Sequence, residues 1–291
     1  MYRSLLVTVI ASIAIASLMV KRSPLSAIAS PLHSHSGRTA SDRPSVPSIA
    51  TGAIATPEAP EIARAISVRI LTATGSGSGA IVARQGQTYT VLTNHHVIAD
   101  GSAQGYSLIT PDGQMQTAWH VPVAQFADLD LALVQFTSAN RYRVAAIAHP
   151  DTVSLGETLY AAGFEAWHFT SNGNTLVSVE DTRQWGIRAF RLTTGRMQMR
   201  SPRSLVGGYE IGYTNDVVQG MSGGPVLTQN GELIAINGKL KYPFLGIRAF
   251  IFADGSMPSP QLFAQMESLS WAIPITKFQN PVNSTPNRRG L

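Results

Sequence analysis

The sequence contains no cysteine, and only 13% of its 291 residues are charged. The absence of cysteine excludes a small disulfide-stabilised scaffold, and the content of 44% hydrophobic residues excludes a disordered chain. No long stretch shows a sustained 3.6-residue hydrophobic period, which argues against a helical fold. The chain should therefore bury a sizeable core, and its length fits one or two domains.

An excess of charge of one sign is also missing from the central part of the chain. The formal net charge of +5 arises near the ends, because residues 61–277 carry 15 basic and 15 acidic side chains. Six arginines fall between Arg183 and Arg203, but no aromatic residues are regularly interleaved with them. A neutral central region gives no general field that attracts DNA or RNA, so we expect no nucleic-acid partner.

The N-terminal residues have the features of an export signal. A positively charged start precedes 16 uncharged residues, Leu5–Val20, which are short for a membrane span of about 20 residues. Of two small-x-small cleavage motifs we prefer Ala27–Ala29, because the other lies inside the apolar stretch. Residues 1–29 are interpreted as a cleaved signal peptide of a periplasmic or secreted protein that keeps no stable membrane span. The basic residues directly after the stretch leave an uncleaved membrane anchor as the alternative.

The next segment lacks the apolar anchors that would offset the entropy of ordering. Residues 22–60 contain six prolines and no aromatic residue, so residues 30–60 are interpreted as a flexible tether. His33 and His35 stand in it without a nearby carboxylate cluster, so we expect no metal site. Residues 278–291 are interpreted as a flexible tail.

Short β-like segments begin after Ile62. They are rich in Val, Ile, Leu and aromatic residues, and Gly, Asn, Asp and Pro separate them. This pattern predicts an all-β sandwich or pair of barrels rather than alternating βαβ units. One short helix is expected at 261–268. The expected strands are 66–71, 80–84, 88–93, 131–136, 158–164, 187–192, 209–213, 225–227, 233–237 and 271–275.

A glycine-rich turn carries the most specific motif, Gly220-Met221-Ser222-Gly223-Gly224-Pro225. Such a turn frees backbone N–H groups to point into one small volume, which is what an oxyanion hole requires. The N–H groups of Gly220 and Ser222 are the natural pair. No Gly-Lys-Ser/Thr follows the glycines, so a phosphate-binding loop is not indicated.

Two further motifs precede the serine. Thr93-Asn94-His95-His96-Val97 ends an expected strand, and an imidazole there could take the proton of a serine hydroxyl. Taken alone, the two histidines could equally be half of a metal site. Asp128 or Asp130, just before an apolar strand, could accept the second imidazole proton and fix the tautomer.

Together these motifs resemble the serine proteases of the chymotrypsin fold, most closely their bacterial cysteine-free members. The resemblance covers about residues 61–277 and includes Gly75–Ala80, T-N-x-H-V, D-L-A-L, G-x-S-G-G-P and Trp271–Ile275. It implies two perpendicular antiparallel six-stranded β-barrels, at 61–150 and 151–277, with the active site between them. It also implies that no cofactor is needed.

The resemblance assigns the catalytic roles. Ser222 is the expected nucleophile, His96 rather than His95 its base, and Asp130 rather than Asp128 the residue that orients the base. Asp216, six residues before Ser222, occupies the place of a buried pocket carboxylate that selects Arg or Lys before the scissile bond. A strand after the nucleophile is expected to pair with the substrate backbone through Ala235, Ile236, Asn237 and Gly238.

The sequence departs from the digestive members of this family at Met221, where they carry an aspartate used in activation. Because 14 residues follow Lys277, we also expect no appended PDZ domain like that of the heat-shock relatives. The predicted function is an exported serine endopeptidase that acts on peptides or proteins. The alternative is a catalytically silent or latent peptide-binding protein of the same fold. The sequence does not indicate an oligomeric state.

Overall fold

The computed structural model describes residues 58–100, 105–173 and 175–279. They belong to one compact unit, Pro57–Leu291. The expected signal peptide and nearly all of the expected tether and tail lie outside the described residues, as do His33 and His35. In the part of the chain that the structure describes, no helix is both long and apolar enough to cross a membrane.

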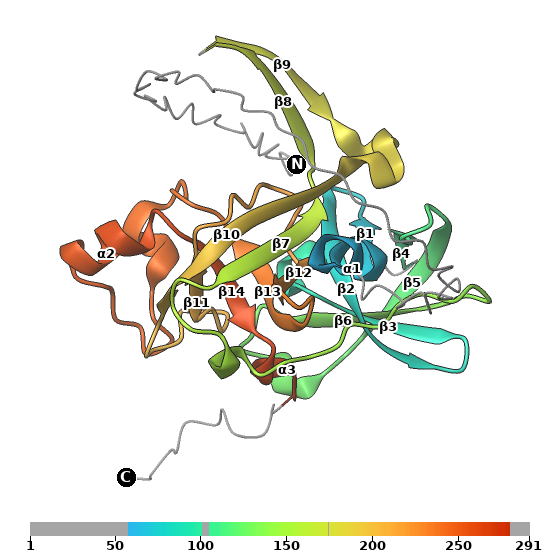
Figure 1. Cartoon of the computed structure of the whole chain (residues 1–291), viewed down its shortest axis with the longest axis horizontal. Helices are drawn as coiled ribbons and strands as arrows, with labels where there is room; N and C mark the ends of the chain where they lie inside the picture. Colours follow the sequence, from blue (N-terminus) through green and yellow to red (C-terminus); the bar gives the residue numbers. More distant parts are fainter. Residues whose placement is uncertain (1–57, 101–104, 174, 280–291) are drawn as a thin grey trace, which may run out of the picture. The chain divides into compact units, whose positions relative to one another are not determined.

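The described residues form two closed barrels of six antiparallel strands. Figure 1 labels the strands. The first barrel has the strand order β1-β2-β3-β6-β5-β4, and the second has the order β10-β11-β14-β13-β12-β7. The predicted all-β fold with two six-stranded barrels is thereby confirmed. The strands of the first barrel are β1 (Ser67–Leu71), β2 (Ser76–Gln85), β3 (Thr88–Thr93), β4 (Tyr106–Ile109), β5 (Met115–Val121) and β6 (Ala132–Thr137). Those of the second are β7 (Thr158–Phe164), β10 (Phe190–Arg200), β11 (Ile211–Tyr213), β12 (Pro225–Thr228), β13 (Leu233–Lys239) and β14 (Ser270–Pro274).

The barrel interiors follow from alternation of apolar and polar residues along the strands. In β6, Ala132, Val134 and Phe136 are buried in the first barrel, while the residues between them are only partly buried. The ring of Phe136 stacks on Tyr89 with 5.1 Å between centroids. The second barrel has its own core, and a third cluster joins residues of both barrels.

The sequence analysis did not predict the helix α1 (Ala59–Ile66) that precedes the first barrel. Pro60 stands in its first turn, and Ile62, Ala63 and Ile66 form a buried face. Although α1 leads into β1, it packs largely on β7, β10 and β12 of the second barrel. The helix thereby ties the start of the fold to both barrels. The expected helix near 261–268 is observed as α2 (Pro260–Met266), and a short α3 (Thr276–Gln279) follows β14.

A two-stranded ribbon, β8 (Trp167–Asn172) and β9 (Thr175–Asp181), connects β7 to β10 (Figure 1). Most of its side chains are exposed, including Phe169 and Val177. At the base of the ribbon, the buried Arg69 of β1 donates to the carbonyl and the hydroxyl of Thr182, both at 2.7 Å. The first barrel thus holds the base of this ribbon through one arginine.

Candidate active site

The two histidines of the T-N-H-H-V motif stand in a 3-10 turn, His95–Val97, directly after β3. The turn begins where Val97 N–H donates to the Asn94 carbonyl at 3.2 Å. Both histidines are exposed, but only the second faces a carboxylate: His96 Nδ1 lies 2.6 Å from Asp130 Oδ2. The side chain of His96 is 47% exposed, which leaves its ring accessible to a substrate.

Asp130 is held just before β6 by contacts on both of its carboxylate oxygens. Besides the His96 ring on Oδ2, the His96 backbone N–H donates to Oδ1 at 2.9 Å, and the Tyr209 hydroxyl donates to Oδ2. Burial works to raise the pKa of Asp130, but the hydrogen bonds from His96 and Tyr209 outweigh it and hold that pKa below its ordinary value. Asp130 is therefore a charged acceptor for the imidazole at neutral pH. Among the described residues, the exposed Asp128 contacts neither histidine.

The loop with Ser222 packs against the first barrel through Ser78 of β2. Ser78 N–H donates to the Ser222 carbonyl at 2.8 Å, and Ser78 Oγ donates to the Gly220 carbonyl at 2.8 Å. The same Oγ accepts from Phe164 N–H at 2.8 Å. Ser78 is fully buried, so it joins the serine loop to strands of both barrels.

Glycine is required where this loop passes closest to the histidine turn. A Cβ on Gly223 would lie 2.1 Å from the Ser78 carbonyl oxygen and 3.1 Å from Asn94 N. Gly223 also has a φ of +85°, which L-residues rarely adopt. The motif residues around Ser222 and the turn that carries His96 are thus brought together. Among the described residues, Ser222 and His96 share no hydrogen bond, a common finding for catalytic groups without substrate.

The backbone N–H groups of the loop fall into two sets. Those of Met221, Gly223 and Gly224 donate to carbonyls within the fold. Those of Gly220 and Ser222 donate to no acceptor among the described residues. The two N–H groups expected to form an oxyanion hole are therefore the ones left free. Met221 is fully buried in the second barrel, so the position before Ser222 is part of the core.

Asp216 differs from the buried pocket carboxylate that the sequence predicts. Its side chain is 66% exposed, and Oδ2 lies 3.3 Å from Arg191 Nη2. Arg191 also contacts Glu165, whose other oxygen lies 2.9 Å from His168 Nδ1. The expectation of a buried Asp216 is therefore wrong, because the carboxylate turns outward to an arginine of β10.

Three of the four residues expected to pair with substrate are interior to the second barrel. Ala235, Ile236 and Asn237 are fully buried, and β14 pairs with all three along one edge of β13. On the other edge β12 pairs with Ala235 and Ile236, and the backbone of Asn237 bonds to Gly223 and Gly224. Gly238 is only partly buried. A strand edge open to a peptide can therefore begin at Gly238 but not at Ala235.

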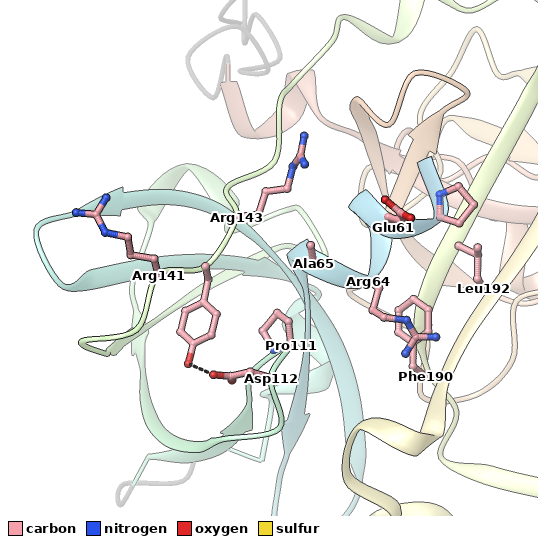
Figure 2. A pocket seen from close by; sticks show the side chains of 11 residues that line it. Glu61, Arg64, Ala65, Pro111, Asp112, Arg141, Arg143, Phe190 and Leu192 are labelled. Atoms are coloured by element: carbon pink, nitrogen blue, oxygen red, sulfur yellow. Dashed lines mark hydrogen bonds between the residues drawn. The ribbon is translucent and has the colours of Figure 1, made fainter. Parts of the chain in front are cut away.

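A cavity of about 620 Å³ lies away from these groups, between α1, the loops at 111–112 and 141–143, and the start of β10 (Figure 2). The guanidinium of Arg64 lies 4.2 Å from the Phe190 ring centroid at one side of it. None of the residues singled out by the sequence motifs lines this cavity. The described residues hold no group of three or more His, Asp and Glu side chains that could bind a metal ion.

Two contributors to this site, Ser78 and Tyr209, were not assigned any role from the sequence. Ser78 lies within the Gly75–Ala80 segment that carries part of the family resemblance, but its side-chain contacts reach residues far away along the chain. Tyr209 follows two glycines, Gly207 and Gly208, that no expected strand or turn explained. In the sequence, this glycine pair was the feature that could have drawn attention to Tyr209.

Comparison with known proteins agrees with the fold. The family profile of the trypsin-like peptidase domain matches residues 77–236. The probable periplasmic serine endoprotease DegP-like of Brucella suis biovar 1 is 26% identical over 193 residues, which are 65% of this chain and 32% of that protein. The magnetosome formation protease MamE of Magnetospirillum gryphiswaldense is 26% identical over 209 residues, which are 70% of this chain and 24% of that protein. The chain thus aligns with no more than about a third of the length of these relatives.

Proposed function

Because this chain belongs to the family of trypsin-like peptidases, we propose that it is an exported serine endopeptidase with His96, Asp130 and Ser222 as its catalytic triad. The observation that carries the proposal is the pair of bonds from His96 to Asp130, beside a loop that presents Ser222 and two free N–H groups. An imidazole whose Nδ1–H is held by a carboxylate keeps Nε2 free to accept a proton.

The proposed reaction proceeds through an acyl-enzyme. Ser222 Oγ attacks the peptide carbonyl carbon while His96 Nε2 takes the hydroxyl proton, and the N–H groups of Gly220 and Ser222 stabilise the oxyanion. His96 then gives the proton to the leaving amine as the C–N bond breaks. A water molecule, deprotonated by the same nitrogen, attacks the ester and releases the acid and Ser222.

The substrate backbone would add to the free edge of the second barrel. We assign this edge to residues 238–240 rather than to Ala235–Asn237, because the backbone of Ala235–Asn237 is already hydrogen-bonded on both sides, by strands or by the Ser222 loop. Main-chain pairing at such an edge binds an extended peptide without reading its side chains.

Cleavage after Arg or Lys is a further part of the proposal. An exposed ion pair such as Asp216–Arg191 contributes about 0–1 kcal/mol, so a substrate cation could replace Arg191 at little cost. A peptide library read out by mass spectrometry tests this preference. Asp216→Asn should lower kcat/KM for basic residues, and an unchanged profile would exclude Asp216 as the determinant.

Export by a cleaved signal completes the proposal. The match to a relative named as periplasmic supports it, together with the apolar N-terminal stretch of the sequence. Amino-terminal sequencing of the exported protein should find a start near residue 30. An intact Met1 in membrane fractions would support the uncleaved anchor instead.

Labelling with a fluorophosphonate tests the triad directly. Wild-type protein should be labelled, whereas Ser222→Ala and His96→Ala should not be. His95→Ala is a matched control, because this neighbouring histidine is also exposed and lies outside the contacts to Asp130. The control should keep full labelling. Folded wild-type protein without label would contradict an active endopeptidase and favour the silent or latent peptide-binding protein of the same fold.

A further inference from the structure

Tyr209 reaches the proposed triad from the second barrel through a segment shaped for that approach. The Gly207 carbonyl accepts from Asp130 N–H at 2.9 Å, and Gly207 has a φ of +86°. A Cβ on Gly207 would lie 3.1 Å from Asp130 Cβ, and one on Gly208 would lie 2.7 Å from Leu129 Cδ2. The two glycines therefore allow the backbone to approach the segment that holds Asp130.

The Tyr209 hydroxyl and the His96 ring meet on one oxygen atom. Tyr209 Oη lies 2.5 Å from Asp130 Oδ2, and His96 Nδ1 lies 2.6 Å from the same atom. An ionised carboxylate can only accept, so the tyrosine must donate. Tyr209 is 2% exposed, and a Cβ on Gly238 would lie 2.2 Å from its hydroxyl oxygen. The phenol is thus enclosed and fixed in this contact.

We propose that Tyr209 is a positioning residue of the protease: by donating to Asp130 Oδ2 it fixes the carboxylate against His96 and takes up part of its negative charge. The proposal rests on the function proposed above. A carboxylate that shares its charge with a phenol holds the protonated imidazole less strongly. Loss of the Tyr209 hydroxyl should therefore let His96 stay protonated to higher pH.

The charged and titratable groups around Tyr209 favour a protonated phenol that donates a hydrogen bond to Asp130. Lys239 Nζ of β13 lies 4.7 Å from the ring centroid, and Tyr213 of β11 is directed elsewhere, to Asn237 Oδ1 at 2.5 Å. Burial, followed by the charge of Asp130, raises the pKa of Tyr209 well above its ordinary value. The phenol therefore keeps its proton at neutral pH and remains a donor.

The test compares Tyr209→Phe with Tyr89→Phe. Both rings are buried, but the Tyr89 hydroxyl donates to the Asn140 carbonyl at 2.8 Å and contacts no proposed catalytic group. For Tyr209→Phe we expect kcat to fall about tenfold with little change in KM, because one hydrogen bond to a charged group is lost. The acid midpoint of the pH–rate profile should move up by about half a pH unit. Tyr89→Phe should change neither value, and an unmoved midpoint in Tyr209→Phe would overturn the proposal.

Titration of the histidine ring protons by NMR separates this proposal from the proposed function. In the background of Ser222→Ala, Tyr209→Phe should still raise the titration midpoint of His96, whether or not the wild-type protein cleaves peptides. Incorporation of 3-fluorotyrosine at position 209 makes the phenol a stronger donor and should lower that midpoint, which covers the case in which Tyr209→Phe does not fold. A midpoint that responds to neither change would show that Tyr209 only fills space.

Discussion

Ser78 gives the sharpest test of how the two barrels assemble the site. Ser78→Ala removes one hydroxyl and leaves two buried partners, the Gly220 carbonyl and the Phe164 N–H, without their hydrogen bonds. A buried polar group left unpaired costs about 1–3 kcal/mol, so the two together should destabilise the fold by about 2–6 kcal/mol. This is a large part of a typical unfolding free energy of about 5–15 kcal/mol.

Ser78→Ala should also loosen the loop that carries Ser222. The backbone bond from Ser78 N–H to the Ser222 carbonyl survives the substitution, so the loop stays near the first barrel, but the carbonyl of Gly220 loses its anchor. Rotation of that peptide redirects the backbone next to the proposed oxyanion donors. We therefore expect slower fluorophosphonate labelling together with the loss of stability.

Calorimetry and labelling rates, measured side by side, check this reasoning. A loss near 4 kcal/mol should lower Tm by about 10 °C in a domain of this size. Ser76→Ala is the matched control on the same strand, because Ser76 Oγ has only a 3.4 Å contact from Arg69 Nη2. If the Tm of Ser78→Ala lies within about 1 °C of that of Ser76→Ala and the variant is labelled at the wild-type rate, the reasoning is refuted. The two hydrogen bonds of the Ser78 hydroxyl would then not stabilise the fold by the expected amount.

Three further changes follow from the same contacts. Gly223→Ala should abolish labelling, because its Cβ would lie 2.1 Å from the Ser78 carbonyl oxygen, and a labelled, folded variant would contradict the packing. The pKa of Asp130 is depressed in the fold, so its charge stabilises the protein above the ordinary carboxyl pKa, and this contribution is lost as pH falls through the depressed value. Asp130→Asn should therefore flatten the dependence of stability on pH below about pH 4, as followed by urea unfolding. Ile62→Ala, on the buried face of α1, should cost about 2–5 kcal/mol yet leave the labelling of folded protein unchanged, as measured well below its Tm.

The strands that were predicted well from the sequence are those in which burial follows the local alternation of apolar and polar residues. In β6, and in the first four residues of β3, buried residues alternate with partly exposed ones, which matches a period of two. The ribbon β8–β9 was missed because nearly all of its residues are exposed, so its strands bury no face against a core. Helix α1 was missed because its eight residues are too few for a helical period to stand out beside the proline-rich segment.

For the candidate site, the motifs predicted which residues come together better than they predicted how buried each residue is. The choice of His96 over His95 and Asp130 over Asp128 agrees with the contacts that the structure shows, although their catalytic roles remain proposals. The predicted burial of Asp216 was wrong: its carboxylate is exposed and contacts Arg191, which lies 25 positions earlier in the sequence. No local pattern encodes a pairing over that distance.

The contacts that complete the site cross between the barrels in both directions. Ser78 of the first barrel holds the loop of Ser222, and Tyr209 of the second barrel holds the carboxylate that orients His96. Each barrel therefore positions a proposed catalytic group that belongs to the other. Separation of the barrels would remove the contact of Ser78 with the Ser222 loop and the contact of Tyr209 with Asp130. The site therefore requires that both barrels are folded and packed together. This reciprocity explains why Gly207, Gly208 and Gly223 of the second barrel lie against the first, where an added Cβ would meet Asp130, Leu129 or Ser78.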